Sequence, residues 1–202
     1  MPRIILASGN AKKIGELREL LAPDGYQLDG LDSVPDCPEL IEDGDTFLAN
    51  ATIKARTVAL HAGCFAIGED SGLCVDALGG KPGLYSARYA GTHSDDEANN
   101  GKLVAALADV AAERRTAHYE STIVLCDPQG EVVATGAGQC YGRIVDEPRG
   151  TNGFGYDPHF LIREYHQTFG ELPPVVKRAI SHRARAMRQF LPRLRAAVGS
   201  GT

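Results

Sequence analysis

Residues 116–145, "TAHYESTIVLCDPQGEVVATGAGQCYGRIV", decide the fold class. Two strand-like runs, 116–126 and 131–145, flank the turn sequence DPQG, and this pattern is typical of a β-hairpin. Earlier in the chain, short apolar runs alternate with helical patterns, as they do in α/β proteins. A hairpin fits poorly into a purely parallel, doubly wound sheet. The sequence therefore predicts an α/β fold with a long mixed β-sheet flanked by helices.

The remaining elements follow from apolar periodicity and from capping residues. Strands are expected at 3–7, 26–31 and 64–68. Helices are expected directly after Gly9 and Asn10, at 45–62 with Asp45 as N-cap, at 94–108 with "SDDE" as a capping box, and at 175–198. The glycine-rich residues 71–92 are expected to form a long ordered loop or lid.

Composition limits the class of protein. The 202 residues, 43% of them hydrophobic, suffice for one domain over 1–202 with two lobes. A net charge of -5 gives no basic surface for nucleic acid or acidic membranes, but it leaves room for a small anionic ligand in a local basic pocket. Five scattered cysteines without a C-x-x-C pair argue against disulfides and zinc, and no apolar run is long enough to span a membrane. We expect a soluble, cytoplasmic protein.

A candidate phosphate cradle lies in "LASGNAKKIGEL", residues 6–17, between the first strand and the first helix. Free N–H groups at a helix start attract anions, Gly9 lets a phosphate approach closely, and Lys12 and Lys13 add positive charge. The spacing is not that of a Walker loop. An ordinary strand-to-helix turn with surface lysines is the alternative.

Two pairs of adjacent carboxylates are candidates for a metal site. Glu42 and Asp43 lie in an acidic loop, whereas Glu69 and Asp70 end the strand expected at 64–68. If the fold brings them together, their repulsion requires a cation, and oxygen ligands beside phosphates suit Mg²⁺. One carboxylate can then orient or deprotonate a water. The alternatives are a solvated loop for the first pair and a turn cap for Asp70.

A candidate nucleobase site lies in "TNGFGYDPHF", residues 151–160. The rings of Phe154 and Tyr156 can stack on a base, and Asp157 can read its edge. The alternative is an Ω-loop whose aromatic rings anchor it to the core.

The last candidate segment is "KRAISHRARAMRQF", residues 177–190. Lys177 is a candidate phosphate ligand, and the pair His182 and Arg183 can donate hydrogen bonds to carbonyl oxygens of a base. Ser181 is a natural N-cap for the helix that follows. A solvated basic helix face is the alternative, and it is the favoured reading for the arginines after Arg183.

Five segments, in this order, resemble the inosine triphosphate pyrophosphatase family: "SGNAKK", "DGDTFLANATIKAR", "EDSGLCVDALGGKPGLYSARYAG", "TNGFGYDPHF" and "KRAISHR". Each is weak alone, but five in register are specific, and together they span nearly the whole chain. The resemblance implies Mg²⁺-dependent hydrolysis of ITP, dITP and XTP to the monophosphate and pyrophosphate. It also implies a long mixed sheet in two lobes, with the nucleotide in a central cleft, and a homodimer.

The resemblance also assigns residues. Asp70 corresponds to the metal ligand and proton acceptor and Glu42 to an acidic metal-site residue. Glu69 stands where a second aspartate is usual, and it is a candidate further metal ligand because Ala49 replaces an expected glutamate. The implied substrate contacts are Ser8, Gly9, Asn10, Lys12, Lys13 and Lys54 on the phosphates, Ser71 beside Asp70, Phe154, Gly155, Tyr156 and Asp157 on the base, and Lys177, His182 and Arg183 on the rest of the nucleotide.

The implied mechanism is attack on the α-phosphorus by a water that Asp70 aligns, with Lys13, Lys54 and Lys177 offsetting the triphosphate charge. Two other functions remain open. One is a pyrophosphatase for other modified nucleotides, such as modified pyrimidines, against which the "SHR" segment argues. The other is a nucleotide-sensing module that binds without hydrolysis, against which Asp70 and Glu42 argue.

Overall fold

The computed structural model describes residues 3–24, 26 and 28–199. The strands are β1 (Ile4–Leu6), β2 (Leu28–Asp29), β3 (Phe65–Val75), β4 (Thr116–Cys126), β5 (Val132–Ile144), β6 (Phe160–Ile162) and β7 (Gln167–Thr168). The α-helices are α1 (Ala11–Leu21), α2 (Phe47–Ala62), α3 (Asp96–Ala106), α4 (Pro174–Ile180) and α5 (His182–Val198). Short 3₁₀ turns are η1 (Ala22–Asp24), η2 (Leu31–Ser33), η3 (Asp76–Leu78), η4 (Gly83–Arg88), η5 (Ala112–Arg114) and η6 (Asp157–His159).

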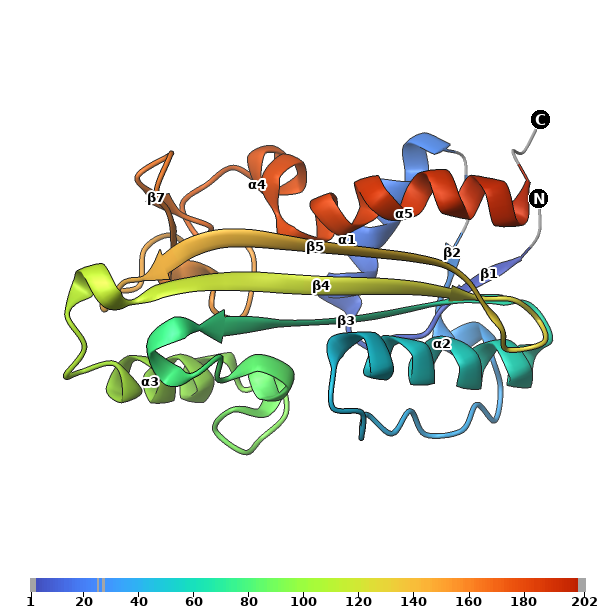
Figure 1. Ribbon diagram of the computed structural model, residues 1–202, viewed down its shortest axis with the longest axis horizontal. Coiled ribbons are helices and arrows are strands. Elements are labelled where there is room, and N and C mark those ends of the chain that lie inside the picture. The colour runs from blue at the N-terminus through green and yellow to red at the C-terminus, as the bar shows by residue number, and fades with distance from the viewer. Residues whose placement is uncertain (1–2, 25, 27, 200–202) are drawn as a thin grey trace. The chain divides into compact units, whose positions relative to one another are not determined.

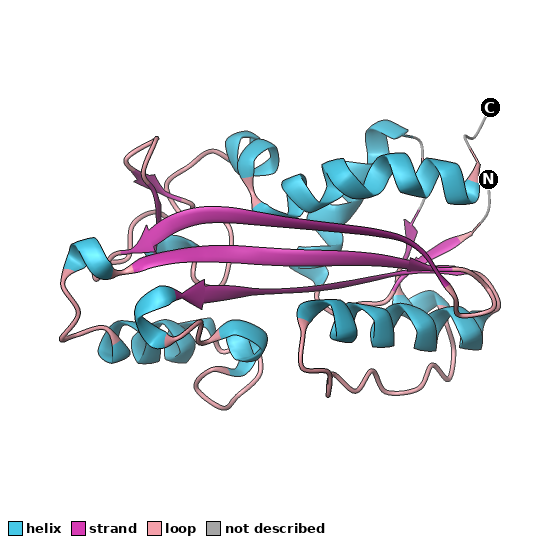
Figure 2. Cartoon of the chain, in the orientation of Figure 1, coloured by secondary structure: helices cyan, strands magenta, loops and turns pink. Residues whose placement is uncertain are grey.

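The seven strands form one mixed sheet in the order β2-β1-β3-β4-β5-β6-β7. Strand β1 is parallel to β2 and to β3, whereas β6 is antiparallel to β5 and to β7. Figure 2 separates these strands from the helices by colour. The predicted α/β class with a mixed sheet flanked by helices is confirmed.

The hairpin that decided the fold class is present. Strands β4 and β5 are neighbours in the sheet. The DPQG turn closes between them, with the amide of Asp127 donating to the carbonyl of Glu131 at 3.0 Å and that of Gly130 to Asp127 at 2.9 Å. The first strand and helix are also confirmed as β1 and α1. The strand expected at 26–31 includes residue 27, which lies outside the described residues, and β2 covers Leu28–Asp29.

Three helix boundaries differ from the prediction. The N-cap of α2 is Thr46 and not Asp45, because the Thr46 hydroxyl accepts the amide of Ala49 at 3.0 Å. Helix α3 is capped by Asp95, which accepts the amide of Ala98, and Ser94 precedes the cap. The last helix is two helices, since Ser181 is extended, with ψ 162°, between α4 and α5.

The prediction that the strand ends at Asp70 and that a loop begins at residue 71 is wrong. Strand β3 runs for 11 residues and carries Ser71 and Gly72 in its interior, so only residues 76–92 of the expected loop lie outside it. Strand β3 lies between β1 and β4. Neighbouring strands supply backbone hydrogen bonds that outweigh the local turn preference of a Ser-Gly pair.

The chain divides into two compact units, the first made of Met1–Asp70, Ser121–Gly138 and Arg183–Thr202, the second of Ser71–Glu120 and Gln139–His182. In the first unit, successive strand residues face opposite sides of the sheet. Figure 1 shows α5 on one side of these strands and α2 on the other. The expected single domain with two lobes and a central cleft stays a prediction.

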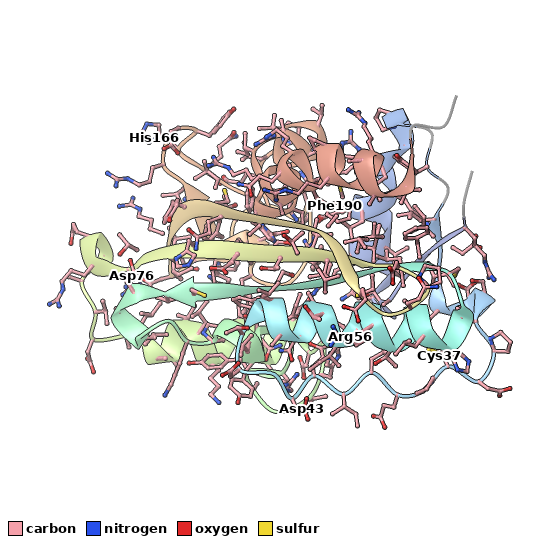
Figure 3. All side chains as sticks on the ribbon, turned by 45° about the vertical axis from the view of Figure 1, so that its right-hand side comes forward. Cys37, Asp43, Arg56, Asp76, His166 and Phe190 are labelled. Carbon is pink, nitrogen blue, oxygen red and sulfur yellow. The ribbon has the colours of Figure 1, made fainter. Side chains whose placement is uncertain are left out.

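Each face of the first unit has its own core. Facing α1 and α5, the buried residues include Ile4, Leu6, Ile67, Ile123, Leu125, Leu17, Met187 and Phe190; Figure 3 labels Phe190 on α5. Facing α2, they are smaller and include Ile5, Ala7, Ala66, Val124, Ala51, Ala55 and Ala59. The small side chains let α2 lie close to the strands.

The second unit has one core, in which aromatic rings are prominent. The ring of Tyr119 lies 4.6 Å from that of Phe160, which lies 5.4 Å from Phe169. Leu103 and Leu107, from the C-terminal end of α3 and the residue after it, join this core. In the part of the chain that the structure describes, no helix is long and apolar enough to cross a bilayer.

Candidate functional site

A buried charged cluster surrounds Asp70 in the first unit. The ammonium of Lys54 lies 2.9 Å from Asp70 Oδ1 and 3.3 Å from Glu42 Oε1. The side-chain amide of Asn50 donates to Asp70 Oδ2 at 3.3 Å. Lys54 and Asp70 are each only 5% exposed. Two carboxylates from separate segments therefore converge on one positive charge.

Helix α2 holds this cluster in place. Asn50 and Lys54 are one helical turn apart and face the same side. Asn50 also accepts the amide of Gly44 at 2.8 Å, which ties the acidic loop to the helix. Gly68 of β3 has no side chain where α2 passes, and a Cβ there would collide with the carbonyl oxygen of Ala51. The close approach of helix and strand is what brings Lys54 to Asp70.

The surroundings of Asp70 shift its pKa. Burial raises the pKa of this carboxyl, the positive charges of Lys54 and Lys13 oppose the rise, and the nearby charge of Glu42 adds to it, so that the pKa lies above its ordinary value. A carboxylate with a raised pKa is a stronger base than an ordinary aspartate.

A second cluster surrounds Glu69. The Ser121 hydroxyl donates to Glu69 Oε1 at 2.8 Å, and Arg183 Nε donates to the same oxygen at 3.1 Å. Lys13 Nζ lies 3.2 Å from Glu69 Oε2. Arg183, 3% exposed, also pairs with Glu16 at 2.8 Å. This cluster links α1, β3, β4 and α5.

The partners of Glu69 determine its charge state. Burial alone raises the pKa of Glu69, but the charges of Arg183, Lys13 and Lys54 and the Ser121 hydrogen bond outweigh it and hold the pKa far below the ordinary value. Glu69 is therefore ionised across the physiological range.

The strand-to-helix turn at Ser8–Lys13 has the geometry of an N-capped helix start. Asn10 Oδ1 accepts the amides of Lys12 and Lys13, both at 3.1 Å, and the amide of Asn10 donates to Ser8 Oγ at 3.2 Å. No atom lies within 4 Å of the position that a Cβ on Gly9 would take. The turn thus leaves open space beside Gly9 at the positive end of α1, but the Asn10 side chain already binds two of the amides that a phosphate would use.

The loop predicted to bind a base is held in the second unit by an ion pair. Asp157 Oδ2 accepts Lys177 Nζ at 2.6 Å and the amide of Phe154 at 2.8 Å. The Lys177 ammonium lies 4.7 Å from the centre of the half-buried Phe154 ring. The Phe154 ring therefore lies against the buried ion pair of Lys177 and Asp157.

Tyr156 and His182 have buried positions in the same unit. Tyr156 is 4% exposed and its hydroxyl donates to the carbonyl of Ser86 at 2.7 Å, so it anchors the loop as the Ω-loop alternative expected. The His182 ring stacks on Tyr119 with centres 4.7 Å apart. Gly155 lies between Phe154 and Tyr156 with a positive φ of 61°.

The structure brings together only part of the predicted site within each unit. Lys13, Lys54, Glu42, Glu69, Asp70 and Arg183 form the two clusters of the first unit, and Phe154, Asp157 and Lys177 form one in the second. Ser71 continues β3 in the second unit, and Asp43 is exposed on the loop before α2 (Figure 3). The roles of all these residues in binding and catalysis stay predictions.

Several residues in these clusters were not found from the sequence. Asn50 had one usable signal, its spacing of four residues from Lys54, whereas Glu16 had none, because it pairs with Arg183 across 167 residues of sequence. Ser121 had none, because it reaches Glu69 across 52 residues of sequence. Asp96 and Asn100, which contact Gly155, lie in the helix predicted at 94–108, and no sequence signal indicated that contact.

The carboxylate oxygens of Glu42 and Asp70 are suitable ligands for a metal ion. Among residues 3–24, 26 and 28–199, no group of three acidic, histidine or cysteine side chains is already gathered as a metal site. The oxygens of Glu42 and Asp70, however, already share the cation of Lys54, and carboxylate oxygens are ligands that Mg²⁺ prefers. Glu69 Oε1 accepts hydrogen bonds from Ser121 and Arg183, whereas the buried Oε2 has only the ion pair with Lys13 and accepts no hydrogen bond from the residues that the structure describes.

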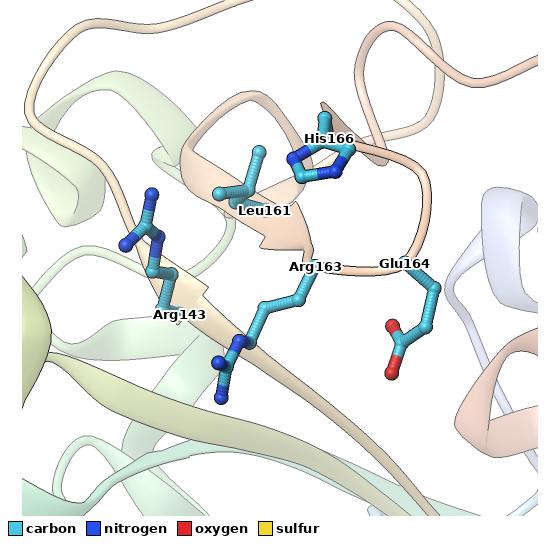
Figure 4. Close-up of a pocket in the computed structure, with 5 residues that line it drawn as sticks. All are labelled: Arg143, Leu161, Arg163, Glu164 and His166. Carbon is cyan, nitrogen blue, oxygen red and sulfur yellow. The ribbon is translucent and has the colours of Figure 1, made fainter.

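A pocket of about 450 Å³ lies elsewhere in the second unit, at the β5–β6 edge and the turn that follows (Figure 4). Its lining residues are Arg143, Leu161, Arg163, Glu164 and His166, none of which belongs to the predicted site.

Comparison with known proteins gives consistent matches along nearly the whole chain. The model of the Ham1 family matches residues 4–193. The chain is 52% identical over 191 residues to a dITP/XTP pyrophosphatase of Rhodopirellula baltica, which covers 95% of this chain and 92% of that protein. It is 48% identical over 187 residues to the protein of that name from Geobacter sulfurreducens, covering 93% and 94%.

Solved structures agree with these matches. A HAM1 protein from Coxiella burnetii superposes with a TM-score of 0.86 at 36% identity, covering 100% of both chains. A nucleoside-triphosphatase and dITP/XTP pyrophosphatase from Mycobacterium abscessus superposes with a TM-score of 0.76 at 44% identity, covering 92% of this chain and 96% of that one.

Proposed function

Because the chain belongs to the Ham1 family, we propose that it hydrolyses the deaminated purine nucleoside triphosphates dITP, ITP and XTP to the monophosphate and pyrophosphate. The substrate class comes from the relatives named dITP/XTP pyrophosphatase, and these relatives confirm the family predicted from the five motifs. The observation that carries the chemistry is the buried cluster in which Asp70, with a raised pKa, is held by Lys54 and Asn50.

Asp70 acts as the proton acceptor in this proposal. The oxygen of a water attacks the α-phosphorus, the bond from that phosphorus to the bridging oxygen of the β-phosphate breaks, and the water proton passes to an Asp70 oxygen. Pyrophosphate is the leaving group. Lys54 and Asn50 support the role by fixing the orientation of the carboxylate.

The turn at Ser8–Lys13 binds the triphosphate in this proposal. The positive end of the α1 dipole favours negative charge there, Gly9 leaves room for a phosphate, and Lys12 and Lys13 add full charges. Lys13 is also held by Glu69, whose ionised carboxylate keeps it beside the turn. We propose that Lys54 adds a further positive charge for the phosphates.

Glu42 and Asp70 would hold a Mg²⁺ ion in this proposal, because their oxygens converge on one cation position, which the Lys54 ammonium fills and would have to share or leave. When bound, the ion would offset charge that develops on the phosphate oxygens. Glu69 stays the third candidate, but a metal there must displace Arg183, Ser121 or Lys13, so we give it the role of anchoring Arg183 and Lys13.

The loop around Phe154 binds the base in this proposal. The Phe154 ring offers a stacking surface, and backbone groups at Gly155 together with His182 and Arg183 read the base edge. We assign Lys177 to this loop, where it pairs with Asp157, and not to the phosphates. A site that donates to the 6-keto oxygen of hypoxanthine and xanthine leaves donors unpaired against adenine, which rejects dATP.

A nucleotide panel tests the proposal. The purified chain is assayed for pyrophosphate release from dITP, XTP, dATP, dGTP and a modified pyrimidine triphosphate, with Mg²⁺ and with EDTA. We expect release from dITP and XTP at least about 100-fold more efficiently than from dATP, and only with the metal. Binding of dITP without release would favour the sensing module, and preference for the pyrimidine would favour the other pyrophosphatase.

We also propose that the protein is cytoplasmic, as its scattered cysteines suggest, and that it is a homodimer, which the resemblance of the motifs implies. Light scattering on the purified protein tests the assembly, and a mass equal to one chain at assay concentration would contradict it.

A further inference from the structure

The start of helix α3 holds the peptide groups of Gly155 from both sides. Asp96 Oδ2 accepts the Gly155 amide at 2.9 Å, and Asn100 Nδ2 donates to the Gly155 carbonyl at 2.9 Å. The two side chains are one helical turn apart, and Asn100 Nδ2 also donates to the backbone carbonyl of Asp96 at 2.9 Å. Both backbone polar groups of one loop residue are thus bound by one helix.

The chemistry of the contacts fixes the orientation of the Asn100 amide. Both neighbours of its side-chain nitrogen are carbonyl oxygens, which only a donor can satisfy. Asp96, on the other side, faces an N–H group, which only an acceptor can satisfy. The helix therefore presents one acceptor and one donor that match the two groups of Gly155.

Residues 153–157 need such an external hold. Gly153 and Gly155 have φ values of 77° and 61°, and they lie on either side of Phe154. Glycine has the largest backbone freedom to lose, so a loop with two of them pays a high entropic cost to keep one shape. Within the loop, Asp157 binds the amide of Phe154. Asp96 and Asn100 supply the constraint at Gly155.

We propose that Asp96 and Asn100 are positioning residues for base recognition: by holding Gly155 they set the place of the Phe154 ring and of the loop's backbone groups against the purine. This inference rests on the proposed function of the loop. It predicts that the two residues affect the choice of base more than the chemistry at the phosphates.

The test uses variants of the full chain matched to the contacts. Asp96→Ala removes the acceptor, whereas Asp96→Asn keeps an oxygen of the same size at the same place. Asn100→Asp replaces the donor with an acceptor that faces two carbonyl oxygens, and Asn100→Ala removes the donor without adding charge. Glu97→Ala is the control, because it removes a carboxylate from the same exposed helix turn without touching the loop and so reproduces the loss of favourable charge at the helix start.

For each variant that shows a cooperative thermal unfolding transition, kcat and KM are measured with dITP and with dATP. We expect Asp96→Ala, Asn100→Ala and Asn100→Asp to lower the ratio of kcat/KM for dITP over dATP by roughly tenfold, mainly through the KM for dITP. We expect Asp96→Asn and Glu97→Ala to stay within about threefold of the wild type.

An unchanged ratio in folded variants, an equal loss with both nucleotides, or the same loss in Glu97→Ala would overturn the inference. Failure of the proposed function looks different, because the wild type itself would then release no pyrophosphate from dITP. In that case the ratio of dissociation constants for dITP and dATP, measured by calorimetry on the same proteins, tests the positioning role, and an unchanged ratio again overturns it.

Discussion

Glu69 and Asp70 are consecutive residues of β3, and their carboxylates lie on opposite faces of the sheet. Glu69 meets Arg183 of α5 and Lys13 of α1, whereas Asp70 meets Lys54 and Asn50 of α2. The alternation of side chains along a strand explains why two like charges stand side by side. Each carboxylate therefore contacts cations on its own side of the sheet, while the charges of Lys13 and Lys54 also act on both.

The two carboxylates consequently differ in acidity. The pKa of Asp70 is raised, with burial as the largest cause, whereas the pKa of Glu69 is lowered because its cationic partners outweigh burial. Groups whose environments push their pKa values apart are suited to different roles. We therefore expect Asp70 to handle the proton and Glu69 to hold Arg183 and Lys13.

Replacing Asp70 by asparagine tests the first role. Asp70→Asn keeps the size of the side chain but removes the proton acceptor, so we expect kcat for dITP to fall by about 10²–10⁴-fold. Asp45→Asn is the matched control, since Asp45 is exposed on the same unit and does not cap α2, and its kcat is expected to be unchanged. Steady-state pyrophosphate release measures both, and undiminished turnover of Asp70→Asn would rule out the assignment.

Removing the charge of Lys54 tests how the two acids of its cluster are stabilised. Lys54→Met leaves Asp70 buried without its cation, and breaking a buried pair in this way costs about 3 kcal/mol or more of unfolding free energy. The loss of positive charge raises the pKa of Asp70 further, so the folded variant binds a proton more readily than the unfolded chain. The stability of the variant then falls as pH rises from the pKa of Asp70 in the unfolded chain to its higher pKa in the folded variant.

Urea unfolding at pH 5 and pH 8 measures this effect. The destabilisation by Lys54→Met is expected to be larger at pH 8, where Asp70 must either ionise without a partner or take up a proton. The exposed Lys81 provides the control substitution Lys81→Met, with little change at either pH. An equal cost at both pH values would show that Asp70 does not depend on Lys54 for its charge.

Turn chemistry and periodicity predicted most of the fold, and they failed where pairing with neighbouring strands decided the outcome. The DPQG turn predicted the hairpin correctly, because a type of turn depends on its own few residues. Ser71 and Gly72 predicted a turn and are found inside a strand, because β1 and β4 lie on either side of β3. The local sequence of β3 does not indicate which strands will pair with it.

The candidate site was predictable where its residues sit together in a motif. The phosphate turn and the loop at residues 151–160 stood out because unusual residue types are adjacent there. The burial of Lys54 does not follow from such a motif, because its partner Asp70 comes from a separate element. Contacts between elements, such as Ser121 with Glu69, depend on register and helix placement that the sequence alone does not state.

The ion pairs of Glu69 predict a pH dependence of stability. Its folded pKa lies far below the ordinary value of about 4.5, so its contribution is fully present above that value and is lost as pH falls toward the folded pKa. Glu69→Gln leaves Arg183 buried without this partner and is expected to cost about 2–4 kcal/mol at pH 7.

Chemical unfolding from pH 7 down to pH 3 checks this prediction. The stability difference between the wild type and Glu69→Gln is expected to shrink below about pH 4.5, whereas the exposed control Glu39→Gln shows little difference at any pH. A difference that stays constant down to pH 3 would mean that the charge of Glu69 does not stabilise the fold.

The close contact of α2 with β3 at Gly68 allows the effect of helix packing to be tested without changing any charged group. In Gly68→Ala the new methyl group collides with the carbonyl oxygen of Ala51, and α2 must shift away from the strand. We expect a loss of about 1–3 kcal/mol in unfolding free energy. Because the shift also moves Lys54 from Asp70, kcat for dITP should fall although no charged group has changed.

The control for this substitution is Gly15→Ala in α1. The position is exposed, and no atom lies within 4 Å of the added Cβ, so the same chemical change is expected to raise stability by up to about 1 kcal/mol through helix propensity. Thermal unfolding and pyrophosphate release are measured on both variants. If Gly68→Ala lost stability but kept the kcat of the wild type, the distance between α2 and Asp70 would not matter for turnover, and the proposed role of Lys54 in orienting Asp70 would have to be abandoned.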